Sequence, residues 1–336
     1  MEEIKHKHHY VFRAYLKRWA KNKKISCYRI KDKKIFDASL ERIANQRDFY
    51  KIREINDDER KILFSLPSTS AERKSFEIIF AAYQGPIYML KKAEAFKNTI
   101  ECKFPNPTSE LEKAINELIN LAKVGTNNMI EDMYSETENK AIKLIREIIS
   151  GNLNFYYNNS PQTVIADANG MDSKMEFIYF VCAQYFRTKN MRQRFISDMT
   201  KIPDLVFEEK GIKKENIDFE NIVHLWFEVL SSRLADNLYK RQARLIVLKN
   251  NTQVPFITSD QPVINIKEDY KSQEDVEELV FYYPLSPTVA ILLNDDNESK
   301  EMELTEYEVD FYNRKMISAS REQIFSNDSQ SFFRFL

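Results

Sequence analysis

Glycine is scarce in this sequence, which contains only five glycines and ten prolines among 336 residues. Glycine-rich phosphate loops and many-turned β-sandwiches need more glycine than this, so the composition argues against both. Helices need little glycine, and 43% of the residues are hydrophobic. The composition therefore favours long helices and a sizeable core, in one large domain or two intimate ones.

Cysteine is also scarce, and Cys27, Cys102 and Cys182 lie far apart. Three distant cysteines make neither a disulfide framework nor a cysteine-based zinc site. No apolar run is long enough to span a bilayer, and residues 1–24 lack the apolar segment of a signal peptide. We therefore expect a soluble, cytoplasmic protein that has free thiols and no membrane partner.

Neither charge sign dominates, because 50 Lys and Arg residues balance 51 Asp and Glu residues. The whole chain therefore has no electrostatic attraction to nucleic acid or to a membrane, although a local basic patch is compatible with these numbers.

The order of predicted elements indicates an α+β fold. A short helix and two strands occupy residues 1–55, amphipathic helices occupy 56–240, and strands with a closing helix occupy 241–336. Pro86 suits the first position of a helix, so we expect one helix to end before it and another to begin there. We predict a large central helical bundle and a small mixed or antiparallel sheet built from the N- and C-terminal segments. Residues 1–55 and 241–336 would then form one compact unit.

Five short motifs support a family assignment. They are "HHYVFRAYLKRWA" (8–20), "AQYFRT" (183–188), "PFITSDQPV" (255–263), "YPLSP" (283–287) and "NRKMISAS" (313–320). Together they resemble a bacterial family described as domain of unknown function 4238, over the whole chain and in the family's order. Phe12 departs from the pattern, since the family usually has proline there. The resemblance implies that the polar motif residues form a common set, namely His8, His9, Arg13, Arg187, Asp260 and Asn313.

Three of the four histidines lie near the N-terminus, at His6, His8 and His9. Histidine transfers protons near neutral pH and binds metals through its neutral ring. In an extended segment His8 and His9 face opposite ways, so one of them could enter a site. The alternatives are a solvated arm or a packed histidine that bonds a backbone carbonyl.

Asp260 follows a predicted strand and precedes a proline-containing turn. A carboxylate displayed at a sheet edge can bind a divalent cation such as Mg²⁺ or Mn²⁺, or can orient a histidine. The alternative is an Asx turn, in which Asp260 bonds its own downstream backbone.

Gln184 and Arg187 are neighbours on one helix face, and Arg187 could hold a phosphate or carboxylate. Arg13 is a second candidate for gripping phosphate, and Asn313 could hold a substrate or cap the preceding loop. The alternative for Arg187 is a solvated helix end.

These candidates lead to three hypotheses. The first is a hydrolase acting on nucleic acid or nucleotide phosphates, with His8 or His9 as general base or metal ligand, and with Asp260 as metal ligand or histidine orienter. Proteins of this kind could serve as toxin or phage-defence effectors. The second is a non-catalytic module that binds nucleic acid or protein, in which the motif residues are structural. The third is an interaction protein with a toxin partner. The sequence does not define the oligomeric state.

Overall fold

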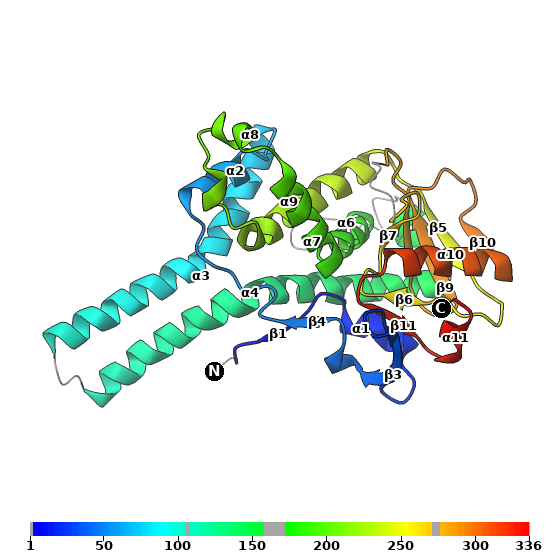
Figure 1. Ribbon diagram of the computed structural model, residues 1–336, viewed down its shortest axis with the longest axis horizontal. Coiled ribbons are helices and arrows are strands. Elements are labelled where there is room, and N and C mark those ends of the chain that lie inside the picture. Colours follow the sequence, from blue (N-terminus) through cyan, green and yellow to red (C-terminus); the bar gives the residue numbers. More distant parts are fainter. Residues whose placement is uncertain (1–2, 105–107, 158–171, 271–275, 336) are drawn as a thin grey trace. The chain divides into compact units, whose positions relative to one another are not determined.

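The structure is a computed structural model that describes residues 3–104, 108–157, 172–270 and 276–335 (Figure 1). The α-helices are α1 (Arg13–Leu16), α2 (Asp57–Phe64), α3 (Ser70–Lys103), α4 (Ser109–Ile149), α5 (Asn154–Tyr157), α6 (Ser173–Phe186), α7 (Lys189–Lys201), α8 (Asp204–Glu208), α9 (Phe219–Lys240), α10 (Glu306–Ala319) and α11 (Gln330–Phe333). Short 3₁₀ helices are η1 (Lys17–Trp19), η2 (Leu40–Arg42) and η3 (Lys214–Asn216). The strands are β1 (Lys7–His9), β2 (Lys24–Arg29), β3 (Lys34–Ser39), β4 (Asn45–Arg47), β5 (Leu245–Lys249), β6 (Thr258–Ser259), β7 (Ile264–Asn265), β8 (Phe281–Pro284), β9 (Val289–Leu293), β10 (Glu301–Glu303) and β11 (Gln323–Ser326).

The chain divides into two compact units, each built from three separate stretches of sequence. Unit 1 contains Met1–His8, Gln46–Ser135 and Arg194–Val229, and unit 2 contains His9–Asn45, Glu136–Gln193 and Leu230–Leu336. The division into 1–55, 56–240 and 241–336 stays a prediction.

Unit 2 contains the two larger sheets. One is antiparallel with the strand order β3-β2-β11-β6, so N-terminal strands pair directly with C-terminal ones. The other has the order β10-β5-β9-β8-β7 and is mixed, because β10 runs parallel to β5. The predicted α+β class and the sharing of one sheet by the two ends of the chain are confirmed. The five-stranded sheet is a second sheet that the sequence did not predict.

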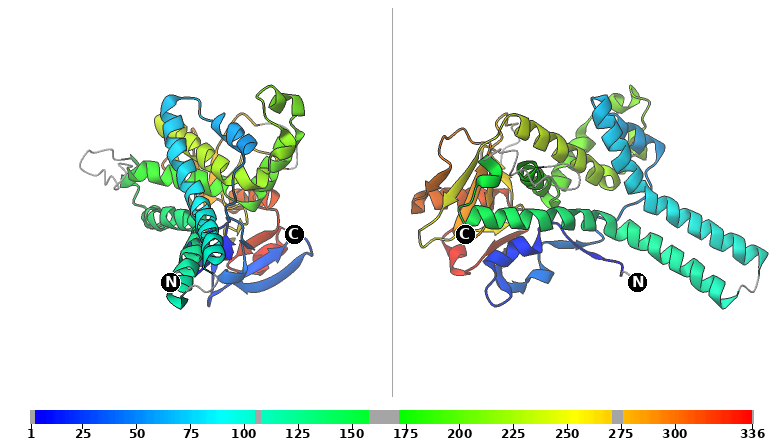
Figure 2. Two further views of the ribbon diagram at one scale, coloured as in Figure 1. Left: turned by 90° about the vertical axis from the view of Figure 1, so that its left-hand side faces the viewer. Right: turned by 180° about the vertical axis from the view of Figure 1, so that it is seen from behind.

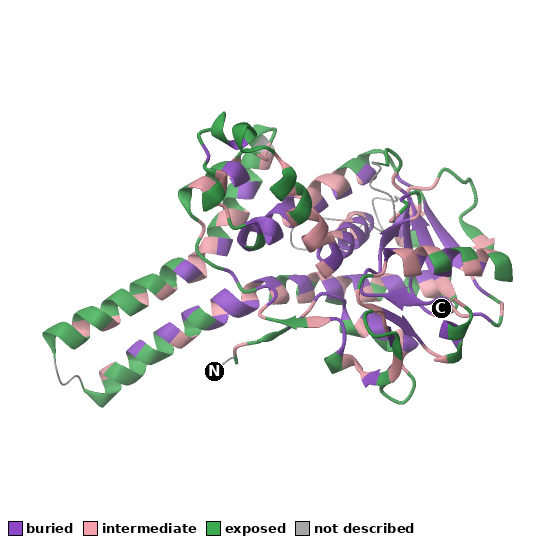
Figure 3. Cartoon of the chain, in the orientation of Figure 1, coloured by how far each residue is buried: buried purple, intermediate pink, exposed green. Residues whose placement is uncertain are grey.

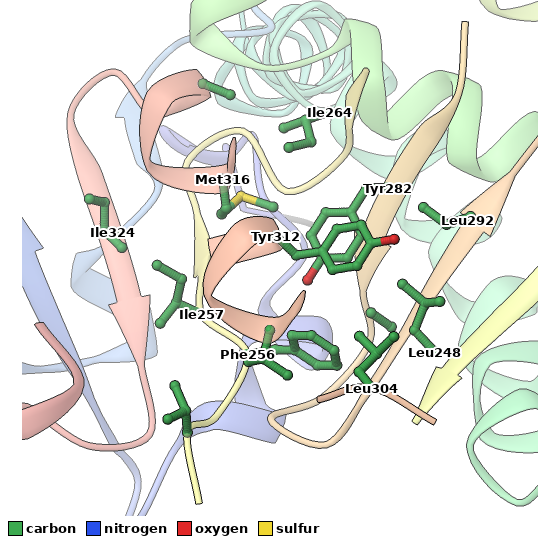
Figure 4. Packing of buried hydrophobic residues seen from close by; sticks show 14 of the residues in the cluster. Leu248, Phe256, Ile257, Ile264, Tyr282, Leu292, Leu304, Tyr312, Met316 and Ile324 are labelled. Carbon is green, nitrogen blue, oxygen red and sulfur yellow. The ribbon is translucent and has the colours of Figure 1, made fainter. Parts of the chain in front are cut away.

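One hydrophobic cluster in unit 2 contains residues of both sheets and of α10 (Figure 4). Tyr282 on β8 stacks on Tyr312 of α10, with ring centroids 4.7 Å apart. Met316, one turn further along α10, is fully buried, and its sulfur accepts a hydrogen bond from the Ser259 hydroxyl. The buried face of α10 therefore contributes to the core beside both sheets.

Unit 1 is mainly helical, and α3 and the first part of α4 lie side by side as a long hairpin in all three views (Figures 1 and 2). The expected break at Pro86 is wrong, because α3 continues through this residue. Pro86 meets α4 at Gly125, where an added Cβ would lie only 3.0 Å from the Pro86 Cβ. Pro86 of α3 and Gly125 of α4 are both unfavourable inside helices, and they lie where the two helices touch. Packing between the helices therefore outweighs the low helix propensity of these two residues.

None of the described helices combines the length and the apolarity that crossing a bilayer requires.

Met316 allows a direct test of the core of unit 2. Replacing it with alanine should lower the free energy of unfolding by about 2–5 kcal/mol, because a buried side chain is lost and a cavity remains. Tyr307→Ala on the same helix is the control, since this ring is 83% exposed and surface changes usually stay within about 0.5 kcal/mol. Urea unfolding measures both values. Equal effects of the two substitutions would contradict this description of the core.

Candidate functional site

The His8 ring is fully buried in unit 1 and has hydrogen bonds at both nitrogens. Its Nδ1 accepts from the Tyr50 backbone N–H at 2.8 Å, so its Nε2 carries the proton and donates to the Lys5 carbonyl at 2.6 Å. Burial lowers the pKa of His8 from its ordinary value of 6.5. The neutral ring therefore links the backbone at Lys5 to the backbone at Tyr50. A general base at His8 would have to break one of these bonds, and that role stays a prediction.

The other N-terminal histidines have different surroundings. His6 is about half exposed and bonds Asp48 through its Nδ1 at 2.7 Å. His9 follows His8 on β1, is partly buried and belongs to unit 2. A catalytic role for His9 also stays a prediction.

Asp260 is buried in unit 2, where its carboxylate binds backbone. It accepts hydrogen bonds from the N–H groups of Arg321, Glu322 and Gln323 at 3.1, 2.6 and 3.3 Å. Burial raises the pKa of Asp260 to about 6, and the three N–H groups oppose this rise. The carboxylate thus holds the start of β11 against the end of β6.

The three neighbours of Asp260 each hold a different element. The Thr258 hydroxyl bonds the Tyr15 hydroxyl of α1 at 2.6 Å, and Ser259 bonds α10 through the Met316 sulfur. The Gln261 amide donates to the Tyr185 carbonyl on α6 at 3.0 Å and accepts from the Thr188 hydroxyl. All four side chains are buried. The Thr-Ser-Asp-Gln segment (258–261) is therefore a hub that connects α1, α6, α10 and β11.

Asn313 has a similar role on α10. Its Oδ1 accepts from the Ile257 N–H at 3.0 Å, and its Nδ2 donates to the Pro255 carbonyl at 3.0 Å. Both polar atoms therefore hold the segment that precedes the hub. The predicted role of Asn313 in substrate binding stays untested.

No group of three or more His, Cys, Asp or Glu side chains in the described residues could hold a metal ion. The described residues therefore provide no set of partners with which Asp260 could bind a metal, and its role as a metal ligand stays a prediction.

Gln184 on α6 and Arg187, which directly follows this helix, are both buried. Phe180, Gln184 and Arg187 follow one another at helical spacing, and the Phe180 ring lies 6.2 Å from the Tyr283 ring of β8. Gln184 is 1% exposed, and neither its amide nitrogen nor its oxygen has a hydrogen-bond partner among the described residues. The Tyr283 hydroxyl is likewise buried without such a partner.

Arg187 is buried and forms an ion pair with Glu138 of α4. Burial raises the pKa of Glu138, whereas the positive charges of Arg187 and Arg13 oppose the rise. Burial raises the pKa of Tyr283. The charges of Arg18 and Arg187 oppose this rise, whereas the charge of Glu138 adds to it.

Three further arginines belong to this group and form no ion pair in the part of the chain that the structure describes: Arg13, Arg18 and Arg146. Arg13 and Arg146 are exposed, whereas Arg18 is partly buried. The positive charge of Arg13 opposes the rise that burial causes in the pKa of Glu138. Burial lowers the pKa of Arg18, and the positive charge of Arg146 lowers it further. We call the set of Gln184, Arg187, Glu138, Tyr283, Arg13, Arg18 and Arg146 the arginine cluster. It extends from the interior of unit 2 to its surface and has four cations for one carboxylate.

The structure thus brings together some of the residues that the sequence singles out. Arg13, Gln184 and Arg187 belong to the arginine cluster, whereas Asp260 belongs to the hub and His8 to unit 1. Sequence reasoning missed Glu138, Arg18 and Arg146. It also gave Tyr283 no role, although this residue opens the "YPLSP" motif.

Comparison with known families gives one match. The model of a family described as "Protein of unknown function (DUF4238)" matches residues 7–330, nearly the whole sequence. The chain therefore belongs to this family, as its motifs predict. No curated protein and no solved structure matches the chain.

The state of His8 can be tested through the pH dependence of stability. Between its lowered pKa and 6.5, the unfolded chain binds more protons than the folded chain. The stability that neutral His8 confers is therefore full above pH 6.5 and is lost as the pH falls through the lowered pKa. As the pH falls from about 7 to about 5, wild type should therefore lose more stability than His8→Gln.

Urea unfolding at a series of pH values measures this difference. Lys7→Gln, an exposed change on the same strand, should keep the wild-type pH dependence. If His8→Gln and wild type lost stability in parallel, the imidazole would not be held neutral.

Proposed function

We propose that the protein binds a phosphate-bearing ligand, either a nucleotide or a nucleic acid, at the arginine cluster. The observation that carries the proposal is the imbalance within this cluster. Its single carboxylate, Glu138, is already paired with Arg187, and Arg13, Arg18 and Arg146 form no ion pair with any of the described residues. Phosphate supplies the negative charge, and arginine is the side chain that best matches its geometry.

The polar atoms inside the cluster support the same ligand chemistry. A buried polar group without a partner costs about 1–3 kcal/mol, and Gln184 and Tyr283 together present three such atoms. The Gln184 amide and the Tyr283 hydroxyl can each donate a hydrogen bond, and phosphate oxygens accept such bonds. A bound phosphate would therefore use donors that the described residues leave unused.

Hydrolysis of the bound phosphate is the catalytic form of this proposal, with a divalent cation and a base from His9 or from Glu138. Glu138 lies in the cluster, and burial raises its pKa, which is the direction that favours a general base. A cytoplasmic location and a role as a toxin or phage-defence effector are part of the same proposal.

The rival proposal is binding without catalysis, and one observation favours it. The motif residues His8, Asp260 and Asn313 all hold backbone segments in place, so conserving the fold would suffice to explain these motif positions. Release of inorganic phosphate or cleavage of an oligonucleotide with Mg²⁺ or Mn²⁺ separates the two forms. Turnover that Glu138→Gln abolishes, with ligand binding retained, supports catalysis. Binding without turnover supports the rival.

Tyr283→Phe is the sharpest test of the binding site. Because this hydroxyl has no hydrogen-bond partner in the described part of the chain, its removal should leave the melting temperature of the free protein unchanged or raise it. The same change should weaken the binding of phosphate ligands at least tenfold, since a hydrogen bond to a charged group contributes about 1.5–3 kcal/mol. Calorimetric titration with ATP, pyrophosphate and a short single-stranded oligonucleotide measures the affinity and separates the two ligand sources.

Tyr282→Phe is the matched control. Its hydroxyl is also buried without a partner among the described residues, but its ring stacks on Tyr312 of α10. This variant should bind like wild type. The proposal fails if none of the three ligands binds at millimolar concentration, or if both variants lose affinity equally.

A further inference from the structure

The hairpin of α3 and α4 is largely exposed along its outer half (Figure 3). Seven of the fourteen large hydrophobic side chains exposed in the described residues lie on these two helices: Ile78, Tyr88, Met89, Phe96, Leu118, Leu121 and Met133. Exposed apolar residues that are scattered singly are ordinary, whereas a continuous row of them usually marks a contact surface.

Six residues of α3 lie at heptad spacing, and all of them except the partly buried Gly85 are exposed. Ser75, Ile78, Ala82, Gly85, Met89 and Lys92 are separated by alternating steps of three and four residues, which places them in one row. We call this row the outer seam. A second row with the same alternation, which includes the buried Phe76, Tyr83 and Ile87, provides the core of unit 1. α3 therefore has two rows with coiled-coil spacing, one of them buried and the other largely exposed among the described residues.

The outer seam reads the same in both directions. From Ser75 to Lys92 the order is polar, large, small, small, large, polar. In an antiparallel pair of two such helices, Ile78 faces Met89 and Ala82 faces Gly85 at the centre. The small residues let the backbones approach closely, while the large pairs close both ends. A two-fold interface between identical chains requires this self-complementarity, whereas an interface with a different protein does not.

Charge selects the antiparallel direction. In a parallel pair Lys92 would face Lys92 of the other copy inside the seam, where like charges repel. In the antiparallel pair Lys92 faces Ser75. The positions beside the seam contain no charged residue between Ile79 and Ala95, and they are Ile79, Ala81, Pro86, Tyr88, Ala93 and Ala95. The flanks therefore add apolar contact.

The area available suits a reversible dimer. The side chains of Ile78, Tyr88, Met89 and Phe96 are 48% to 72% exposed, so each offers roughly 100 Å². Two copies would then bury about 800 Å² from these side chains alone, and the small residues would bring the total near the lower limit of about 1,000 Å² for a specific interface. We propose that a second copy of this chain covers the outer seam in an antiparallel helix pair. This inference is independent of the proposed ligand.

Sedimentation at protein concentrations of about 1 to 200 µM tests the proposal, because an interface of this size suits micromolar dissociation. Wild type should form dimers in this range, and Met89→Glu should weaken the dimer at least tenfold. Tyr307→Glu introduces the same charge at an exposed apolar position of unit 2 and should dimerise like wild type. Met89 is half exposed, so the circular dichroism of its variant should be unchanged. Ile78→Glu is the substitute if that variant does not fold.

Cross-linking tests the direction of the pair. The background variant is Cys102→Ser, because Cys102 is exposed while Cys27 and Cys182 are buried. A short bis-maleimide should join Ile78→Cys to Met89→Cys in a mixture of the two variants, and should join neither variant to itself. A monomer at every concentration, a dimer that Met89→Glu does not weaken, or self-linking of Ile78→Cys as strong as in the mixture would each overturn the proposal.

Discussion

The carboxylate of Asp260 is the interaction on which the rest of unit 2 depends. Its bonds to three successive backbone N–H groups fix the start of β11, which lies between β6 and β2 in the four-stranded sheet. Its neighbours Thr258, Ser259 and Gln261 hold α1, α10 and α6. Four consecutive buried polar side chains thus set the positions of elements from both ends of the chain. Polar contacts inside a core specify one arrangement because each unmade bond is costly.

Much of the fold could be read from the sequence, because strands and helices leave periodic patterns. Strands were predicted within residues 1–55 and 241–336, and the predicted sheet that joins the two ends of the chain is present, since β11 pairs with β2. The division into two sheets could not be predicted, since short apolar runs do not reveal their partners. The continuation of α3 through Pro86 was missed for a similar reason: the compensating residue, Gly125, lies on another helix.

The candidate site shows the same limit. Arg13, Gln184 and Arg187 could be identified because they occur in motifs, yet their common neighbour Glu138 lies in a long charged helix, where nothing local distinguishes it. The N-terminal histidines attracted attention through their rarity. For His8 the structure describes a buried ring whose two nitrogens connect Lys5 to Tyr50. Rarity and motif membership therefore indicate that a residue matters, whereas only its partners show whether it holds the fold or faces a ligand.

The pairing of β2 with β11 has a consequence for how the protein is made. Roughly 300 residues separate the two strands, so this contact is of very high sequence separation, and such contacts slow folding. On the ribosome, β2 and β3 emerge early and form a hairpin whose inner edge lacks its partner until the last strand has been synthesised. An unpaired strand edge is prone to association with other chains. Newly made protein would therefore rely on chaperones, or on slow translation, until residue 326 is available.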